Sequence, residues 1–159
     1  MSRTIFDSWS DFQTSFAQVL ARARSELCIF DDNLEQTGLA KLMNMETLRL
    51  FLTEQQHALV RIALRDASQL RHKQPRLIDL LKSHGHRIKL QEVSDVYVPR
   101  RDCMILADGR HAVVRFDLER PRGKFVLDDA NEVQPYRELF NEIWQTPATP
   151  FSPETAGLH

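Results

Sequence analysis

The chain has 159 residues, 42% of them hydrophobic and 27% charged, which is the composition of a globular protein large enough to bury a core. Lys and Arg total 21 against 22 Asp and Glu, so the net charge of −1 gives no overall positive field to attract nucleic acid or an anionic membrane. No apolar run approaches the roughly 20 residues of a membrane-spanning helix, and the first residues lack an apolar signal-peptide region. These features predict a cytoplasmic protein without membrane contact.

Helical and strand-like patterns alternate through the first half of the chain. Ser8 is placed to cap a helix whose apolar positions recur at helical spacing. A buried strand at 27–30 follows and ends at Asp31, and a helical region at 39–56 leads to a strand at 59–65 that ends at Asp66.

The second half predicts one more helix–strand unit, a hairpin and a closing helix. Pro75 suits the first turn of a helix, because its missing N–H costs nothing there. Strands are expected at 87–93, on both sides of Asp108-Gly109, and at 123–127, before a helix at 135–145. The whole pattern predicts an α/β fold, a mixed sheet flanked by helices on both faces. Residues 1–145 form one domain in this interpretation, and the proline-rich residues 146–159 form a flexible tail.

The hairpin carries charges inside two apolar runs. With a two-residue turn at Asp108-Gly109, Asp102 lies opposite Arg115, and Leu106 lies opposite His111. Both faces of the hairpin are largely apolar, so the buried charges of Asp102 and Arg115 need each other as an ion pair. The functional alternative makes Arg115 an anion-binding group.

The hairpin also resembles the signature strand of the phospholipase D-like family, whose motif is His-x-Lys-x4-Asp-x6-Gly-Ser. Anchoring the motif on Asp108 places Arg101 at the histidine position and Cys103 at the lysine position, while Arg115-Phe116 replaces Gly-Ser. The order of elements over residues 25–145 is similar to one half of a phospholipase D-like fold.

The resemblance implies what chemistry has been lost. In the family, the histidine attacks phosphorus and the lysine neutralises phosphate oxygens. Arginine is permanently protonated and is no nucleophile, and a thiol inside a strand is usually a small core residue. We therefore expect no catalytic residues and no cofactor. Because family members combine two halves, the resemblance suggests a homodimer.

The chain as a whole resembles an uncharacterised bacterial family that occurs alone or joined to acyltransferase modules of the GNAT type. Its opening Phe-Asp-Ser-Trp and closing Phe-Asn-Glu-Ile-Trp carry this resemblance. No acetyl-CoA-binding loop is present, so the resemblance suggests an acyltransferase partner rather than an acyltransferase activity.

Polar residues at the ends of the predicted strands indicate where a ligand could bind. Open α/β sheets bind ligands at the carboxyl ends of their strands. The candidate cleft consists of Asp31, Arg65, Asp66, Arg101, His111 and Arg115. The alternative for the aspartates is helix capping and solvated turns.

Other signals point away from nucleic acid, metal and disulfides. The basic stretch 100–124 is diluted by acidic residues and lacks interleaved aromatic residues, which disfavours nucleic-acid binding. His84 and His86 flank a glycine without a third ligand, so they mark a helix end rather than a metal site. Cys28 and Cys103 lie in predicted strands and are expected to be buried thiols, with a disulfide between them as the alternative.

The function predicted from these observations is a non-catalytic binding or regulatory module with a vestigial phospholipase D-like cleft. The alternative is a divergent phosphodiesterase or transferase that acts on a phosphorylated small molecule or on nucleic acid. A deep pocket with convergent polar groups would favour the enzyme.

Overall fold

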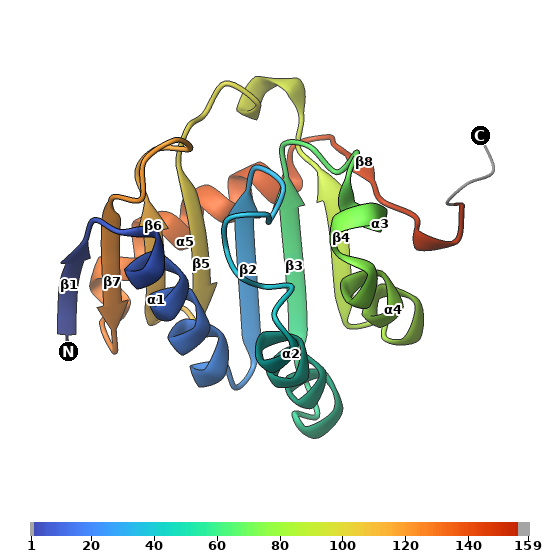
Figure 1. Ribbon diagram of the computed structural model, residues 1–159, viewed down its shortest axis with the longest axis horizontal. Helices are drawn as coiled ribbons and strands as arrows, with labels where there is room; N and C mark the ends of the chain where they lie inside the picture. Colours follow the sequence, from blue (N-terminus) through green and yellow to red (C-terminus); the bar gives the residue numbers. More distant parts are fainter. Residues whose placement is uncertain (1, 156–159) are drawn as a thin grey trace.

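The computed structural model describes residues 2–155 and contains one eight-stranded mixed sheet (Figure 1). The order of the strands is β1-β7-β6-β5-β2-β3-β4-β8. The central strands β2, β3 and β4 are parallel, and every other neighbouring pair is antiparallel. The strand bounds are β1 Ser2–Phe6, β2 Glu26–Asp31, β3 Leu59–Leu64, β4 Ile88–Glu92, β5 Cys103–Ala107, β6 His111–Arg115, β7 Gly123–Leu127 and β8 Thr149–Pro150.

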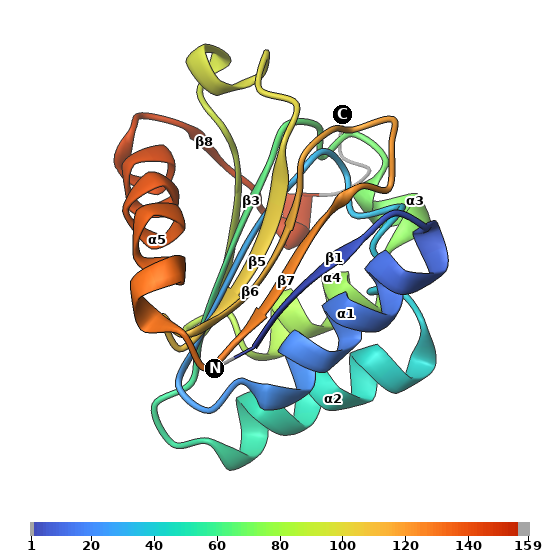
Figure 2. The ribbon, with the colours of Figure 1, turned by 90° about the vertical axis from the view of Figure 1, so that its left-hand side faces the viewer.

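Helices cover both faces of the sheet, as the sequence predicts. Figure 2 shows α1 to α4 on one face and α5 alone on the other. The bounds are α1 Trp9–Arg22, α2 Leu42–Glu54, α3 Leu70–Lys73, α4 Pro75–Ser83 and α5 Ala130–Gln145, with short 3₁₀ helices at Asp95–Tyr97 and Pro153–Thr155. No helix within residues 2–155 has the length and apolar character needed to cross a membrane. The predicted fold class is confirmed.

Local sequence signals explain where most helices begin. Ser8 caps α1 by accepting the N–H of Asp11 at 3.1 Å, and Pro75 occupies the first turn of α4. Helix α5 begins at Ala130, five residues before the predicted start, because Asp129 caps it by accepting the N–H of Glu132. Pro135 therefore lies inside α5 rather than at its first turn.

The hairpin between β5 and β6 has the predicted turn but a different register. Asp108 and Gly109 both have positive φ angles, 57° and 68°, and the N–H of Arg110 donates to Ala107 across the turn. Arg110 is an extra residue, since its carbonyl oxygen accepts the N–H of Asp129 and the ladder resumes with Ala107 opposite His111.

The pairing between β5 and β6 is therefore shifted by one residue from the predicted one. Relative to β5, every β6 side chain lies on the face opposite to the predicted face. Arg115 lies opposite Cys103 rather than Asp102. The predicted ion pair between Asp102 and Arg115 is therefore wrong. Asp102 pairs with Arg100 at 2.8 Å, and the partner of Arg115 is Asp31.

Two edge strands were not predicted. Strand β1 pairs with β7, where Phe6 lies opposite Gly123 and a Cβ on that glycine would come within 2.7 Å of the Phe6 ring. Strand β8 lies in the predicted flexible tail, yet it pairs with β4, and Phe151 packs against the core. The expectation of a tail that packs against nothing is therefore wrong at Thr149 to Phe151, whereas residues 156–159 lie outside the described part of the chain.

Candidate functional site

The polar residues of interest lie at one edge of the sheet, which we call the carboxyl edge because β2, β3, β4 and β6 all end there (top of Figure 1). Asp31 ends β2, Arg65 follows β3 and Arg115 ends β6. Cys103 begins β5, which runs antiparallel to its neighbours and so brings its first residue to the same edge. We call these four side chains the Arg–Cys cluster. Three of them were predicted as cleft residues.

Arg115 is the centre of the Arg–Cys cluster. Its side chain is 2% exposed, and its Nη2 lies 3.7 Å from Oδ1 of Asp31, which is equally buried. The same nitrogen donates to the sulfur of Cys103 at 3.2 Å. The guanidinium carbon lies 5.0 Å and 4.8 Å from the ring centres of Trp9 and Phe12. These α1 rings cover the arginine, so cation–π contact replaces solvent around it.

Arg65 fastens the loop between β4 and β5 to the sheet. Its Nε donates to the carbonyl oxygen of Arg100 at 2.7 Å, and its Nη2 donates to the carbonyl oxygen of Asp102. Its guanidinium carbon lies 4.3 Å from the ring centre of Phe30. Because two of these partners are backbone carbonyl oxygens of the loop and the third is a side chain of β2, the arginine stabilises the loop that passes over the carboxyl edge.

Cys103 stands where the phospholipase D-like motif has its lysine, and its thiol is kept neutral. Burial raises the pKa of this thiol to about 12, and the carboxylate of Asp31 adds to the rise, while Arg115 and Arg65 oppose it less strongly. A neutral buried thiol is a poor nucleophile. The space beside it, between β5 and α1, has no room for a water molecule.

The remaining predicted cleft residues do not join this cluster. Asp66 accepts the N–H of Ser68 at 2.9 Å in a turn, and hydrogen bonding by the Ser68 side chain and then by its backbone N–H lowers the pKa of Asp66. Arg101 is half exposed and binds Asp117 through two hydrogen bonds of 3.0 and 3.1 Å. The hydrogen bond from Arg101 lowers the pKa of Asp117 to about 2.

His111 lies at the opposite edge, because it begins β6 rather than ending it. Its Nδ1 accepts the N–H of Asp128 at 3.1 Å, and burial lowers its pKa. The prediction that His111 lines a cleft with Arg115 is therefore wrong. The two residues are the first and the last of the five-residue strand β6, so their side chains lie at its opposite ends.

Asp108, the one motif residue that survives, has a structural role. Its carboxylate accepts the backbone N–H groups of Arg24, Ser25 and Glu26 at 2.9 to 3.2 Å. It thereby ties the hairpin turn to the start of β2. Burial of the carboxyl group raises its pKa, but these backbone hydrogen bonds outweigh burial and leave the pKa below its ordinary value.

The accessible part of the carboxyl edge is a shallow groove of about 510 Å³ on the α5 side. Sequence reasoning missed Phe116 and Tyr136, which lie in it, because no motif marks them. Arg101 reaches this groove, whereas Asp31, Arg65 and Arg115 do not. Within residues 2–155, no group of three or more His, Cys, Asp or Glu side chains has an arrangement suited to a metal ion. The lining residues are Arg100, Arg101, Asp102, Val114, Phe116 and Tyr136.

Comparison with known proteins identifies the family and the fold. A family model described as a domain of unknown function (DUF7931) matches residues 8–151. The chain belongs to this family. No curated protein matches it.

Three solved structures share the fold at low sequence identity. TrmBL2, an archaeal chromatin protein with a novel mode of DNA binding, aligns with a TM-score of 0.70 and 16% identity over 95% of this chain, which spans about half (54%) of that protein. Nuc from Salmonella typhimurium, a phospholipase D family member, aligns with a TM-score of 0.64 and 10% identity over 94% of this chain and 97% of its own. NucT from Helicobacter pylori aligns with a TM-score of 0.63 and 10% identity over 94% of this chain and 99% of its own. The fold is phospholipase D-like.

Proposed function

We propose that this chain is a non-catalytic binding domain that retains the phospholipase D-like fold without phosphodiester chemistry. The residues that stand at the histidine and lysine positions of the motif carry the proposal. A buried neutral thiol stands at the lysine position of the motif, and a salt-bridged arginine stands at the histidine position. Neither group attacks phosphorus at neutral pH.

The packing around the cluster supports the same conclusion. A phosphodiester needs cationic groups that it can reach, and the side chain of Arg115 lies beneath Trp9 and Phe12 and is only 2% exposed. Arg65 already donates to two backbone carbonyls. The cations that could neutralise a phosphate are therefore engaged in holding the fold together.

Binding would instead use the groove on the α5 side. Arg100 and Arg101 flank the half-exposed ring of Phe116 there. Arg100 and Arg101 are salt-bridged to Asp102 and Asp117, so the groove combines an aromatic ring with a polar rim of both charge signs, which suits a protein partner with an apolar anchor. A second copy of this chain and a GNAT-type acyltransferase module are the two partners that the sequence suggests. Light scattering with size-exclusion chromatography tests the first, and a monomer at 100 µM, about a hundred times a typical micromolar Kd, would contradict it.

Hydrolysis assays test the absence of catalysis. Wild-type protein is incubated with bis(p-nitrophenyl) phosphate and with single-stranded DNA, and the expected rate equals that of buffer. A rate that disappears in Arg115→Ala or Arg101→Ala, with the variants still folded, would overturn the proposal. A rate that is equal in wild type and both variants identifies a contaminating nuclease and leaves the expected result in place.

A second candidate function is binding to DNA, which the likeness to TrmBL2 favours. The stretch 100–124 carries the basic groups that would contact a phosphate backbone, although Arg101 is paired with Asp117. Fluorescence anisotropy with a labelled duplex at several salt concentrations tests it, because phosphate contacts weaken steeply with salt. Specific contact requires that Arg101→Glu weaken binding, while Arg76→Glu on the opposite face leaves it unchanged.

A further inference from the structure

Strand β1 is the outermost strand at one end of the sheet, and its outer side is open (left of Figure 1). Its inner side pairs with β7, from Ser2 opposite Leu127 to Phe6 opposite Gly123. Within residues 2–155, no strand and no backbone hydrogen bond occupies the outer side. An open strand edge presents unpaired N–H and C=O groups, which makes it a template for another strand.

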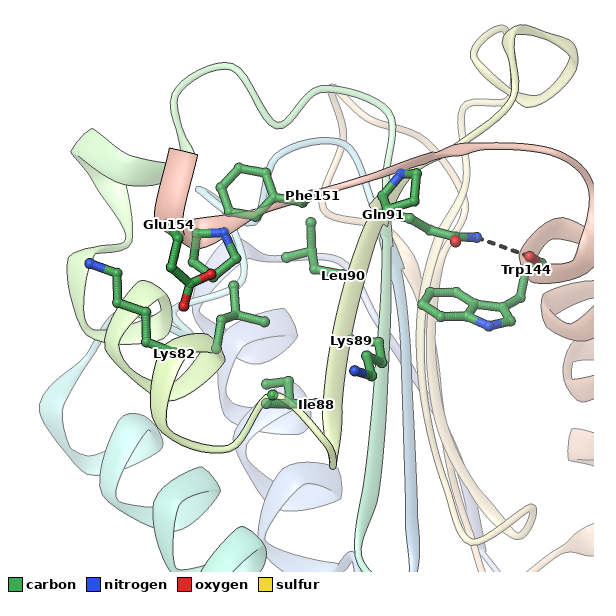
Figure 3. A pocket seen from close by; sticks show the side chains of 12 residues that line it. Lys82, Ile88, Lys89, Leu90, Gln91, Trp144, Phe151 and Glu154 are labelled. Carbon is green, nitrogen blue, oxygen red and sulfur yellow. Dashed lines mark hydrogen bonds between the residues drawn. The ribbon is translucent and has the colours of Figure 1, made fainter. Parts of the chain in front are cut away.

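The other end of the sheet has no comparable open edge. There β8 pairs with β4, and the N–H of Phe151 donates to the carbonyl oxygen of Leu90 at 3.0 Å (Figure 3). The N–H of Ile88, which begins β4, donates to the carbonyl oxygen of His84 at 3.1 Å. Consecutive outward groups without a partner therefore remain at β1 in the described part of the sheet.

The pairing of β7 decides which backbone groups of β1 point outward. In an antiparallel ladder, opposite residues alternate between exchanging two hydrogen bonds and exchanging none. The N–H of Phe116 donates to the carbonyl oxygen of Arg122 at 2.9 Å, so Arg122 turns its backbone groups toward β6. Gly123, the next residue, turns its own toward the last residue of β1. Counting back along β1 by twos, Arg3 and Ile5 are the residues that direct N–H and C=O groups outward.

The side chains along this edge run from basic through apolar to acidic. Arg3 lies on the α5 side of the sheet, because its Nε is 3.6 Å from Oε1 of Glu132. That carboxylate also binds Lys124 at 3.2 Å, so one acid serves two cations. Ile5 shares the face of Arg3 and is 52% exposed. Asp7, directly after the strand, is exposed and forms no hydrogen bond or ion pair with the described residues.

We propose that β1 pairs antiparallel with β1 of a second copy of this chain, about a two-fold axis at Ile5. Ile5 then lies opposite Ile5 of the second copy, and Arg3 lies opposite Asp7 of that copy on either side of the axis. The outward backbone groups of Arg3 and Ile5 gain partners, and the two sheets join into one. The proposal does not rest on the loss of catalysis or on the groove at the α5 side.

The charges select this register over its neighbours. With the axis at Arg3, two arginines would lie directly opposite each other, and like charges in that position destabilise a sheet. With the axis at Thr4, Arg3 would face Ile5, and Asp7 would gain no basic partner. The register about Ile5 matches each charge with its opposite, because the order basic, apolar, acidic is complementary to itself when it is reversed.

Charge reversal tests the register by sedimentation equilibrium of the full chain, with each variant confirmed folded by circular dichroism. The wild type should dimerise with a Kd below about 100 µM. Arg3→Asp and Asp7→Arg, each alone, should raise the Kd about tenfold, because two ion pairs become two repulsions. The double variant should return to within about twofold of wild type. Arg76→Asp, on α4 and away from the edge, is the matched control and should leave the Kd unchanged.

A proline tests the backbone pairing. Ile5→Pro removes an N–H that points outward and leaves the ladder to β7 intact, which is where an edge strand tolerates proline. It should raise the Kd more than tenfold, whereas Ile5→Thr keeps the N–H and should still dimerise.

Three results would overturn the proposal. The first is a wild type that is monomeric at 100 µM, and the second is a double variant no tighter than the single ones. The third is a dimer that Phe116→Ser abolishes and Ile5→Pro leaves intact, because the interface would then be the groove on the α5 side. The hydrolysis assays of the proposed function are independent of all three.

Discussion

The ion pair between Arg115 and Asp31 allows a quantitative test of the Arg–Cys cluster. Arg115→Met keeps an apolar side chain between Trp9 and Phe12 but removes the only cation paired with the buried carboxylate of Asp31 within residues 2–155. Because both side chains of the pair are 2–3% exposed, solvent cannot replace the lost partner. The variant therefore measures the cost of leaving one buried charge unpaired.

The expected magnitude follows from the burial of both groups. Removing one partner of a buried ion pair costs about 3–5 kcal/mol, whereas replacing both partners costs little. We expect Arg115→Met to lower the free energy of unfolding by about 3 kcal/mol. Adding Asp31→Asn should restore about 2 kcal/mol, because an asparagine keeps the oxygen that accepts the N–H of Leu34 at 2.7 Å and carries no charge.

Urea denaturation followed by circular dichroism measures these differences, and fluorescence of the two tryptophans, Trp9 above Arg115 and Trp144 on α5, gives a second probe of unfolding. The four proteins of the cycle must share one m-value for the comparison to hold. The reasoning is refuted if Arg115→Met costs less than about 1 kcal/mol, or if Asp31→Asn destabilises wild type and Arg115→Met equally.

Three further predictions use the titratable groups. The pKa of Asp108 is lowered in the fold, so its stabilisation is present above about pH 4 and is lost as pH falls further. The urea midpoint of Asp108→Asn should lie below that of wild type at pH 7, and the difference should shrink as pH falls below about 4. The pKa of His111 is also lowered, so the free energy of unfolding of wild type should decrease as pH falls below about 6.5. In the same series of urea denaturations at different pH values, His111→Asn should not show this decrease. Burial raises the pKa of both Cys28 and Cys103 to about 12, so Ellman's reagent at pH 8 should label neither thiol until guanidinium unfolds the chain, and rapid native labelling would contradict the burial.

The sequence was sufficient to predict the layers of the fold. Ser8 and Pro75 mark helix starts by local chemistry, and alternating strands and helices require a sheet covered on both faces. The register of the hairpin was not predictable in the same way. It depends on Arg110, whose carbonyl oxygen accepts the N–H of Asp129 from a segment 19 residues away, a contact that no local pattern indicates.

That register decided how much of the candidate site could be predicted. Asp31, Arg65 and Arg115 were identified because each lies at a strand end, and strand ends meet at one edge of a parallel sheet. The pairing among them was missed, since a one-residue shift exchanges the two faces of β6. The cover that α1 provides over Arg115 comes from Trp9 and Phe12, whose helical spacing indicates a buried face but not what it buries.

The central claim, that the carboxyl edge holds no nucleophile, is tested most directly by intact-protein mass spectrometry after incubation with bis(p-nitrophenyl) phosphate. A phosphodiesterase of the family type passes through a covalent phosphoryl-enzyme, which adds mass to the chain. The account predicts an unmodified chain at every time point and pH between 5 and 8. A phosphorylated species that forms in wild type and is absent in folded Arg115→Met would contradict it.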